Sequence, residues 1–255
     1  MNRKDKNIYK SITVVAIIIF LWWLISYLGI FSSFVFPAPQ KVLKSFFRML
    51  GSGELLKGIA VSTSRVLAGF GISFVLAFAL GILTSLVPSA DPWYRHILEF
   101  IRYIPPMALI PLLILWFGIG EASKIIIIVL TSFFPIFLNT NSGLAQCDEK
   151  LIELGEALDM SKRDIFFKIR LPSALPNILV GMRIGLGYSW RAIIGAEMIA
   201  AASGIGYLIL DAQAMSRTDK VIVGIIVIGL IGYLTDVIFG LVLKGLHHGG
   251  GVQNA

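Results

Sequence analysis

Long apolar segments alternate with short polar segments along most of the chain. A helix needs roughly 20 mostly apolar residues to cross a bilayer. Six segments approach that length: 12–30, 64–87, 103–119, 124–142, 177–200 and 221–243. Each is expected to be helical, because backbone polar groups in lipid must be satisfied within the segment. The pattern therefore predicts an all-α polytopic membrane protein of about six transmembrane helices.

The positions of lysine and arginine predict the orientation. Four basic residues precede the first span: Arg3, Lys4, Lys6 and Lys10. The positive-inside rule places such a tail in the cytoplasm, and an even number of spans then places both termini there. Four others would lie outside: Lys41, Lys44, Arg48 and Lys57. They weaken this orientation without reversing it, because the first span usually dominates.

The segment between the first two predicted spans has its own periodicity. Val42, Phe46 and Leu50 recur at four-residue spacing among basic residues. This pattern predicts a short amphipathic helix on the outer membrane surface. A connector packed on the bundle is an equally good interpretation.

Composition supports a membrane protein and excludes several other classes. Hydrophobic residues make up 56% of the chain and charged residues 15%, and the mean hydropathy is +0.84. The net charge of +7 does not indicate nucleic-acid binding, because the basic residues flank apolar spans rather than lining one face. Cys147 is the only cysteine, so an internal disulfide is excluded. No phosphate-binding loop G-x-x-x-x-G-K-[ST] and no H-E-x-x-H motif occurs, and catalysis by this chain is not expected.

The polarity of the chain changes abruptly after residue 143. Five apolar residues then recur at steps of three and four: Leu144, Cys147, Leu151, Leu154 and Leu158. This spacing predicts one helix with an apolar stripe, and acidic residues occupy its other faces.

A second short helix is predicted directly afterwards. Ser161 stands at the N-cap position and Asp164 follows three residues later, as in a capping box. The apolar face of this helix comprises Ile165, Phe166 and Ile169. The helix is expected to end at Leu171–Pro172, because proline disfavours helix at the preceding residue. Residues 143–176 are thus predicted to form a cytoplasmic two-helix hairpin, for which a docking element and a solvated loop are equally good interpretations.

This stretch resembles the cytoplasmic signature of ABC importer permeases: E-A-A, three residues, G, nine residues, then I-x-L-P. Anchored on Ile169, Leu171 and Pro172, the register places the glutamate at Glu153 and the glycine at Asp159. In that family the hairpin fits into a groove of the ATPase subunit and transmits its closure to the membrane helices. The resemblance implies this coupling role for the matching residues.

The chain departs from the signature at two places. Leu154 and Gly155 replace the two alanines, a modest change. Asp159 replaces a turn glycine that often adopts φ > 0, a region that Asp visits more easily than most residues, at roughly 1 kcal/mol relative to Gly. The hairpin is therefore expected to form. Whether Asp159 changes the angle between its helices or its affinity for the ATPase stays open. With Ser161, these residues complete the set assigned to ATPase coupling.

The resemblance covers most of residues 36–240 and is strongest to the sulfonate, taurine and nitrate branch. The matching runs are Phe36–Pro39, Arg102–Pro106, Ala108–Pro111, Trp116–Glu121, Ser123–Lys124, Gly181–Trp190, Ala196–Glu197 and Gly204–Tyr207. The resemblance implies a type I ABC importer permease in the bacterial inner membrane. It further implies a homodimer with two cytoplasmic ATPases, which bind ATP and magnesium, and one extracytoplasmic binding protein. This chain would need no cofactor of its own.

The implied substrate is a small organic anion of the sulfonate, taurine or nitrate type. A vitamin precursor or another small solute is the alternative within the family. An ion-coupled carrier acting alone is a further alternative, against which the hairpin argues.

The expected division is a cytoplasmic tail 1–11, a first span with the external segment 12–63, a permease core 64–246 that includes the loop 143–176, and a tail 247–255.

Ionisable residues inside a span are costly and usually face a bundle interior or a watery cavity. The span 177–200 contains Arg183, Arg191 and Glu197. Arg183 is expected near the cytoplasmic end, where snorkelling is an alternative role. Arg191, next to Trp190, is hypothesised to attract an anionic substrate with Glu197 as its partner, and structural ion pairing alone is an equally good interpretation. Arg102 and Trp190 are assigned to the same translocation path as these three residues.

Two further features concern the C-terminal half. Small residues at Gly181, Gly185 and the Gly195–Ala196 step allow backbones to approach closely. The resemblance places this span near a two-fold interface. Asp236 in the last span is a candidate buried carboxylate for which the sequence identifies no partner.

Overall fold

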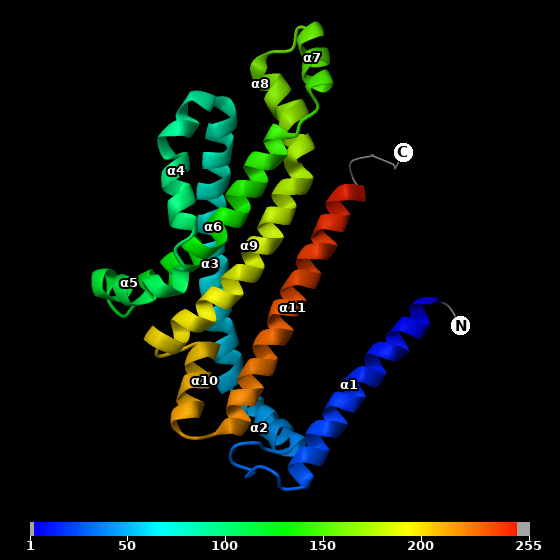
Figure 1. The fold of residues 1–255 in the computed structure, drawn as a ribbon, viewed down its shortest axis with the longest axis vertical. Helices are drawn as coiled ribbons and strands as arrows, with labels where there is room; N and C mark the ends of the chain where they lie inside the picture. The colour runs from blue at the N-terminus through cyan, green and yellow to red at the C-terminus, as the bar shows by residue number, and fades with distance from the viewer. Residues whose placement is uncertain (1–2, 249–255) are drawn as a thin grey trace.

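The computed structural model describes residues 3–248, and over this range the ordered elements are all helical (Figure 1). Of the predicted tails 1–11 and 247–255, residues 1–2 and 249–255 lie outside the described part. In chain order the elements are α1 Arg3–Tyr27, α2 Pro39–Gly51, α3 Glu54–Leu86, η1 Pro88–Ala90, α4 Asp91–Arg102, η2 Pro106–Leu109, α5 Ile110–Phe117, α6 Glu121–Ala145, α7 Glu149–Ala157, α8 Lys162–Ile165, η3 Phe166–Arg170, α9 Leu171–Ala200, α10 Ile205–Ala214 and α11 Thr218–His248.

Four of the six predicted spans are confirmed as parts of long apolar helices. Within the described residues, the helices long and apolar enough to cross a membrane are Glu54–Leu86, Glu121–Ala145, Lys162–Ala200 and Thr218–Leu241. The first predicted span corresponds to α1, whose apolar part, Ile12–Tyr27, is shorter than these four.

The predicted span 103–119 is wrong. This segment forms η2 and α5, which lie at 88° to the preceding helical pair Pro88–Arg102. The chain bends here because Pro105 and Pro106 lack backbone N–H groups and disfavour helix at the residue before each of them. Counting the bent pair as one span gives up to five crossings in the part of the chain that the structure describes.

Helices α6 and α9 form the centre of the bundle, and α3 packs against α6 on the other side. The small residues of α9 permit this contact. A Cβ at Gly181 would lie 2.6 Å from the Asn139 Cβ, and one at Gly185 would lie 3.0 Å from the Ile136 Cγ1. The close backbone approach expected from the sequence therefore occurs within the chain, between α9 and α6.

Helix α2 packs on the bundle rather than lying alone on a membrane surface. Its buried residues are Val42, Ser45 and Met49, and the Ser45 hydroxyl donates a hydrogen bond to Asp219 of α11. Phe46 and Leu50, which share the predicted apolar face with Val42, are half-buried. The interpretation of this segment as a packed connector is confirmed.

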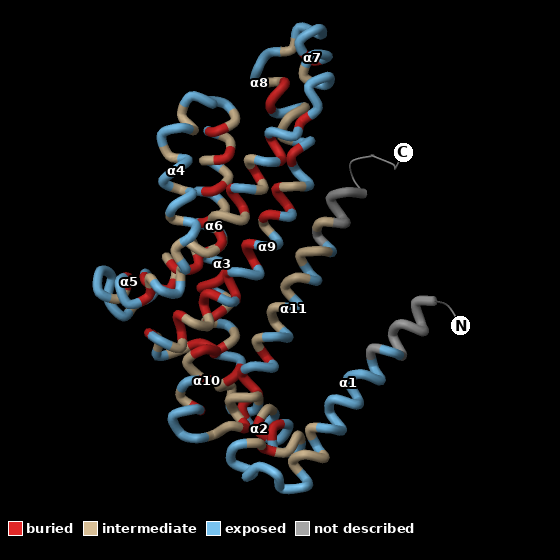
Figure 2. Tube along the Cα trace, in the orientation of Figure 1, coloured by how far each residue is buried: buried red, intermediate tan, exposed pale blue. Residues whose placement is uncertain are grey.

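The hairpin α7–α8 and the pair α2 and α10 lie at opposite ends of the long axis (Figure 1). The described start of α1 and the end of α11 point toward the half of the molecule that carries the hairpin. Buried residues gather where α3, α6, α9 and α10 meet, whereas α1 stands apart from the bundle and is largely exposed (Figure 2).

Candidate functional site

Each of the two helices in the polar hairpin after α6 begins with a side-chain N-cap. The Asp148 carboxylate accepts a hydrogen bond from the backbone N–H of Lys150 at 3.0 Å and caps α7. Ser161 Oγ accepts one from the backbone N–H of Asp164 at 3.1 Å and caps α8. The predicted N-cap at Ser161 is confirmed. The Ser161 hydroxyl also donates to the Asp164 carboxylate at 2.5 Å, in place of the reciprocal backbone bond of a full capping box.

Asp159 ends α7 in the left-handed conformation expected of the missing glycine. Its φ is +54°. The Met160 N–H donates to the Gly155 carbonyl at 3.0 Å and the Asp159 N–H to the Glu156 carbonyl at 3.0 Å. These two bonds are those of a Schellman motif, which normally has glycine at this position. The hairpin forms with aspartate instead, as predicted.

The predicted single stripe from Leu144 to Leu158 is wrong. Leu144 and Cys147 are buried, whereas Leu151, Leu154 and Leu158 are 45%, 56% and 67% exposed. The reason is the helix break between α6 and α7: Leu144 lies on α6 and Cys147 in the break, whereas Leu151 and Leu154 lie on α7 and Leu158 is its C-cap. We call Leu151, Leu154 and Leu158 the leucine face.

The leucine face points outward because another side of α7 packs against the second helix. Gly155 is the buried residue of α7. A Cβ at Gly155 would lie 3.0 Å from the Ile169 Cδ1 and 3.1 Å from the Ile165 Cγ1. The glycine therefore brings the two arms of the hairpin into direct contact. Glu153, the signature glutamate, is exposed on α7.

The second helix does not end at Leu171–Pro172. Residues Phe166–Arg170 form a π-helical turn, and the N–H of Leu171 donates to the carbonyl five residues back. Pro172 follows this wider turn directly and lies inside the helical stretch without ending it. The chain is thus helical from Lys162 to Ala200. The hairpin is joined to a membrane-spanning helix without an intervening loop.

The ionisable residues predicted for the path have different surroundings. Arg183 forms two hydrogen bonds of 2.5 Å to Asp236 of α11, which supplies the partner that the sequence did not identify. Arg191 lies over the Tyr188 ring, 5.6 Å from its centre, and is exposed. The hypothesised pairing of Arg191 with Glu197 does not form.

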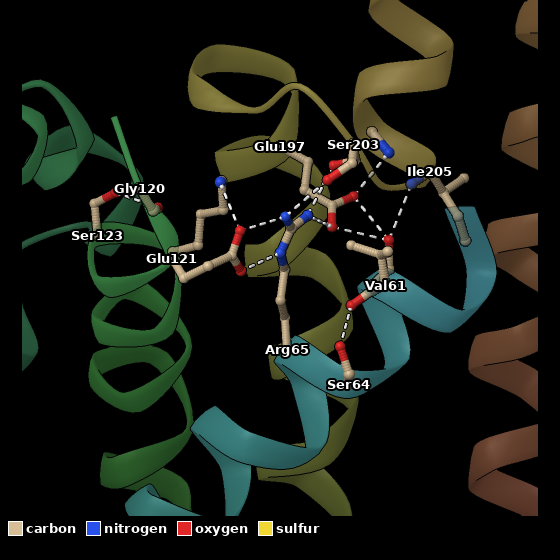
Figure 3. Close-up of polar contacts among 12 residues, drawn as sticks. Val61, Ser64, Arg65, Gly120, Glu121, Ser123, Glu197, Ser203 and Ile205 are labelled. Carbon is tan, nitrogen blue, oxygen red and sulfur yellow. Dashed lines mark hydrogen bonds and ion pairs between the residues drawn. The ribbon is translucent and has the colours of Figure 1, made fainter. Parts of the chain in front are cut away.

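Glu197 is fully buried and belongs to a charge network at the junction of α3, α9 and α10 (Figure 3). Its carboxylate accepts hydrogen bonds from Ser62 Oγ at 2.8 and 2.9 Å and from Arg65 Nη1 at 2.8 Å. It also accepts the backbone N–H of Gly206 at 2.9 Å, at the start of α10. A buried carboxylate is tolerated only when it is paired and hydrogen-bonded in this way.

Arg65 is the centre of this network. A guanidinium has five N–H donors, and here each one is used. Two of them donate to Glu121 at 2.6 Å, one to Glu197, and two to Ser203, at 2.7 Å to its carbonyl and 3.0 Å to its hydroxyl (Figure 3). Lys124 adds a 3.3 Å contact to Glu121. One side chain of α3 thus joins the start of α6, the end of α9 and the loop before α10.

Sequence reasoning missed Arg65, although a signal was present. Arg65 lies within the predicted span 64–87, where any ionisable residue marks a functional or structural site. Its acidic partners, Glu121 and Glu197, both lie in runs that carry the family resemblance, but no spacing in the sequence relates either of them to Arg65.

A cavity of about 410 Å³ lies beside the bend between α4 and η2. Its walls also come from the middle of α6 and the middle of α9. Arg102, the remaining path residue, lines it. Trp190, in contrast, is buried in an apolar cluster with Val66 and Ile128. The structure therefore brings Arg102 and Tyr188, on which Arg191 stacks, to one cavity, and places Arg183 and Glu197 in ion pairs elsewhere.

Residues 73–248 match the family described as the binding-protein-dependent transport system inner membrane component. The chain belongs to this family of ABC transporter permeases. The permease is 38% identical over 234 residues to SsuC of Bacillus subtilis, named as an aliphatic sulfonates transport permease, covering 92% of this chain and 85% of that protein. It is 32% identical over 237 residues to the taurine transport system permease protein TauC of Escherichia coli, covering 91% and 86%.

The fold of the permease agrees with this assignment. An inward-facing structure of the MetNI methionine ABC transporter matches with a TM-score of 0.59 at 20% identity, covering 74% of this chain and 95% of that chain. At this identity the match supports the fold alone. The predicted fold class, an all-α type I ABC importer permease, is confirmed.

Two substitutions at Asp159 test the hairpin turn of the permease. Asp159→Gly is expected to leave the hairpin intact and to raise its stability by up to about 1 kcal/mol, since glycine adopts positive φ without the Cβ clash. Asp159→Val is expected to destabilise it by about 1–3 kcal/mol, because a β-branched residue is strained there. Limited proteolysis between α7 and α8 measures both. Equal cleavage of the two variants would contradict the assigned strain.

Proposed function

We propose that this permease works as a homodimer in the bacterial inner membrane and carries a small organic sulfonate delivered by an extracytoplasmic binding protein. Two cytoplasmic ATPases bind the hairpins, hydrolyse ATP with magnesium and drive alternation between inward- and outward-facing states. The permease itself has no catalytic or cofactor role. Both termini and the hairpin are cytoplasmic, which fits the direction in which α1 and α11 point (Figure 1).

The observation that carries this proposal is the leucine face on a hairpin continuous with α9. Three leucines exposed at 45–67% on α7 and its C-cap are unfavourable in water unless a partner covers them. Because α8, η3 and α9 are helical without a break, a displacement of the hairpin is transmitted directly to the centre of the bundle. An ion-coupled carrier acting alone has no need of such a surface.

The substrate class rests on the relatives and on charge. Their names include aliphatic sulfonates and taurine. The exposed guanidinium groups of Arg102 and Arg191 supply the positive potential that an anion requires, and among the described residues neither is engaged in a salt bridge.

Uptake into proteoliposomes tests the proposal. The permease is reconstituted with the ATPase and binding protein of its operon, and entry of radiolabelled butanesulfonate is followed. We expect uptake only with ATP on the ATPase side, unchanged when ionophores collapse ion gradients. Uptake that needs a gradient and no ATP would establish the ion-coupled carrier instead. ATP-dependent uptake of a thiamine-type precursor without sulfonate uptake would establish the vitamin-precursor alternative.

A further inference from the structure

The cavity beside the α4–η2 bend has a mostly apolar lining that includes a few polar residues. The side chains that form most of its surface are apolar: Ile101, Ile104, Pro106, Leu109, Leu130, Phe134, Pro135, Leu138 and Ile184. Four polar residues complete it: Arg102, Thr131, Asn139 and Tyr188. Its volume of about 410 Å³ lies within the range of ~300–1,000 Å³ typical of small-molecule sites.

The charge of the cavity is positive only. Arg102 is the charged residue of the lining, and no carboxylate is part of it. Arg191 adds a second guanidinium by stacking on Tyr188, 5.6 Å from the ring centre. Arg102 donates a hydrogen bond of 3.3 Å to the Tyr103 hydroxyl, which leaves four of its five N–H donors for a ligand. The lining therefore favours an anion and contains no carboxylate to pair with a cationic group.

The polar groups on α6 are arranged around Pro135. A proline inside a helix cannot donate to the carbonyl four residues earlier, which here belongs to Thr131 in the cavity lining. Asn139 donates one amide N–H to the Pro135 carbonyl at 2.8 Å, so its second N–H and its side-chain oxygen remain available. The middle of α6 thus offers one free amide N–H donor, from Asn139, together with two acceptors, the Thr131 carbonyl and the Asn139 side-chain oxygen.

We infer that this cavity binds an organosulfonate that carries an alkyl chain, with the sulfonate held by Arg102, Asn139 and Tyr188 and the chain packed against Phe134, Leu138 and Ile184. This inference rests on the proposed function and narrows its substrate class to sulfonates with an alkyl chain. Nitrate has no apolar part that could pack against the apolar side chains of the cavity. The ammonium group of taurine would be desolvated without a carboxylate, which is costly.

Direct binding tests this inference without the binding protein. The complex of permease and ATPase in neutral-lipid nanodiscs is titrated with methane-, ethane- and butanesulfonate by saturation-transfer NMR, with taurine and nitrate as competitors. We expect affinity to rise about fourfold for each methylene that becomes buried. Neither competitor is expected to displace butanesulfonate at equal concentration. Affinity independent of chain length, or displacement by nitrate, would overturn the inference.

Three variants separate this site from adsorption to lipid. Arg102→Gln is expected to weaken butanesulfonate binding at least about tenfold, the usual cost of losing a charge-assisted hydrogen bond. Phe134→Ala is expected to weaken butanesulfonate but not methanesulfonate. Arg48→Gln, a matched change at an exposed arginine of α2, is expected to change neither.

The outcomes distinguish this inference from the proposed function. If butanesulfonate fails to bind, or binds equally to wild type and to Arg102→Gln while uptake by the full transporter persists, the cavity assignment is wrong and the proposed function stands. If the full transporter takes up no sulfonate at all, the proposed function is wrong, and the cavity assignment, which rests on it, is overturned too.

Discussion

Replacing Leu154 with serine is expected to weaken the binding of the ATPase to the permease by about tenfold to a hundredfold. Leu154 is 56% exposed at the centre of the leucine face. Burying a leucine side chain contributes about 1.5–3 kcal/mol, and each 1.4 kcal/mol is a factor of ten in affinity. Leu154→Asp is expected to have a larger effect, because it places a charge in the interface. Affinity is measured between the solubilised permease and its purified ATPase, together with ATP-driven uptake.

A matched substitution controls for loss of exposed apolar surface. Leu28 directly follows α1 and is 61% exposed. Leu28→Ser is expected to leave the affinity for the ATPase unchanged. The docking role of the leucine face fails if Leu154→Ser and Leu28→Ser bind the ATPase equally well while both complexes remain folded.

Replacing Arg65 with methionine is expected to destabilise the permease by about 3–5 kcal/mol, the usual cost of leaving a buried charge without its partner. Glu197, whose side chain is 0% exposed, would lose its cation, and the contacts of α3 with Glu121 and Ser203 would be lost as well. The midpoint of thermal unfolding in detergent measures this effect.

Two further variants interpret that shift. Arg95→Met removes the salt bridge between Arg95 and Asp91, in which the arginine side chain is 56% exposed. This change is expected to lower the stability of the permease by less than about 1 kcal/mol. Adding Glu197→Gln to Arg65→Met is expected to recover part of the lost stability, because the unpaired charge is then removed. Equal shifts for Arg65→Met and Arg95→Met would show that the network contributes no more than a surface pair.

The long helices were predictable because each contains enough apolar residues to span a bilayer. Helix α4 was not predicted, because it is amphipathic. Trp93 and Phe100 are exposed on it, while charged residues such as Arg95 and Glu99 interrupt its hydropathy. The apolar residues 103–119 that follow it therefore predict a span of their own, although consecutive prolines bend the chain there. Composition over a window does not report such a bend.

In the hairpin, local signals predicted the ends of the helices better than their packing. The cap at Ser161 and the conformation of Asp159 depend on neighbouring residues and were predicted. The outward direction of the leucine face depends on Gly155 contacting Ile169, which is a tertiary contact. The continuity past Pro172 depends on the π-helical turn, for which the sequence gives no periodic signal.

The pairing of residues in the charge network could not be predicted from the sequence. Arg65, Glu121 and Glu197 are separated by 56 and 76 residues in sequence, and no spacing rule relates them. Each is recognisable alone as an ionisable residue within or next to a span. Their mutual pairing follows only from how α3, α6 and α9 pack.

Hydrogen–deuterium exchange on the hairpin tests the central claim most directly, namely that the ATPase binds the leucine face. Exchange in residues 149–170 is compared for the permease alone and for its complex with the ATPase, with α2, residues 39–51, as an internal reference. The account predicts slower exchange in residues 149–170 on complex formation and unchanged exchange in α2. A complex that forms stably while exchange in residues 149–170 stays the same would contradict it.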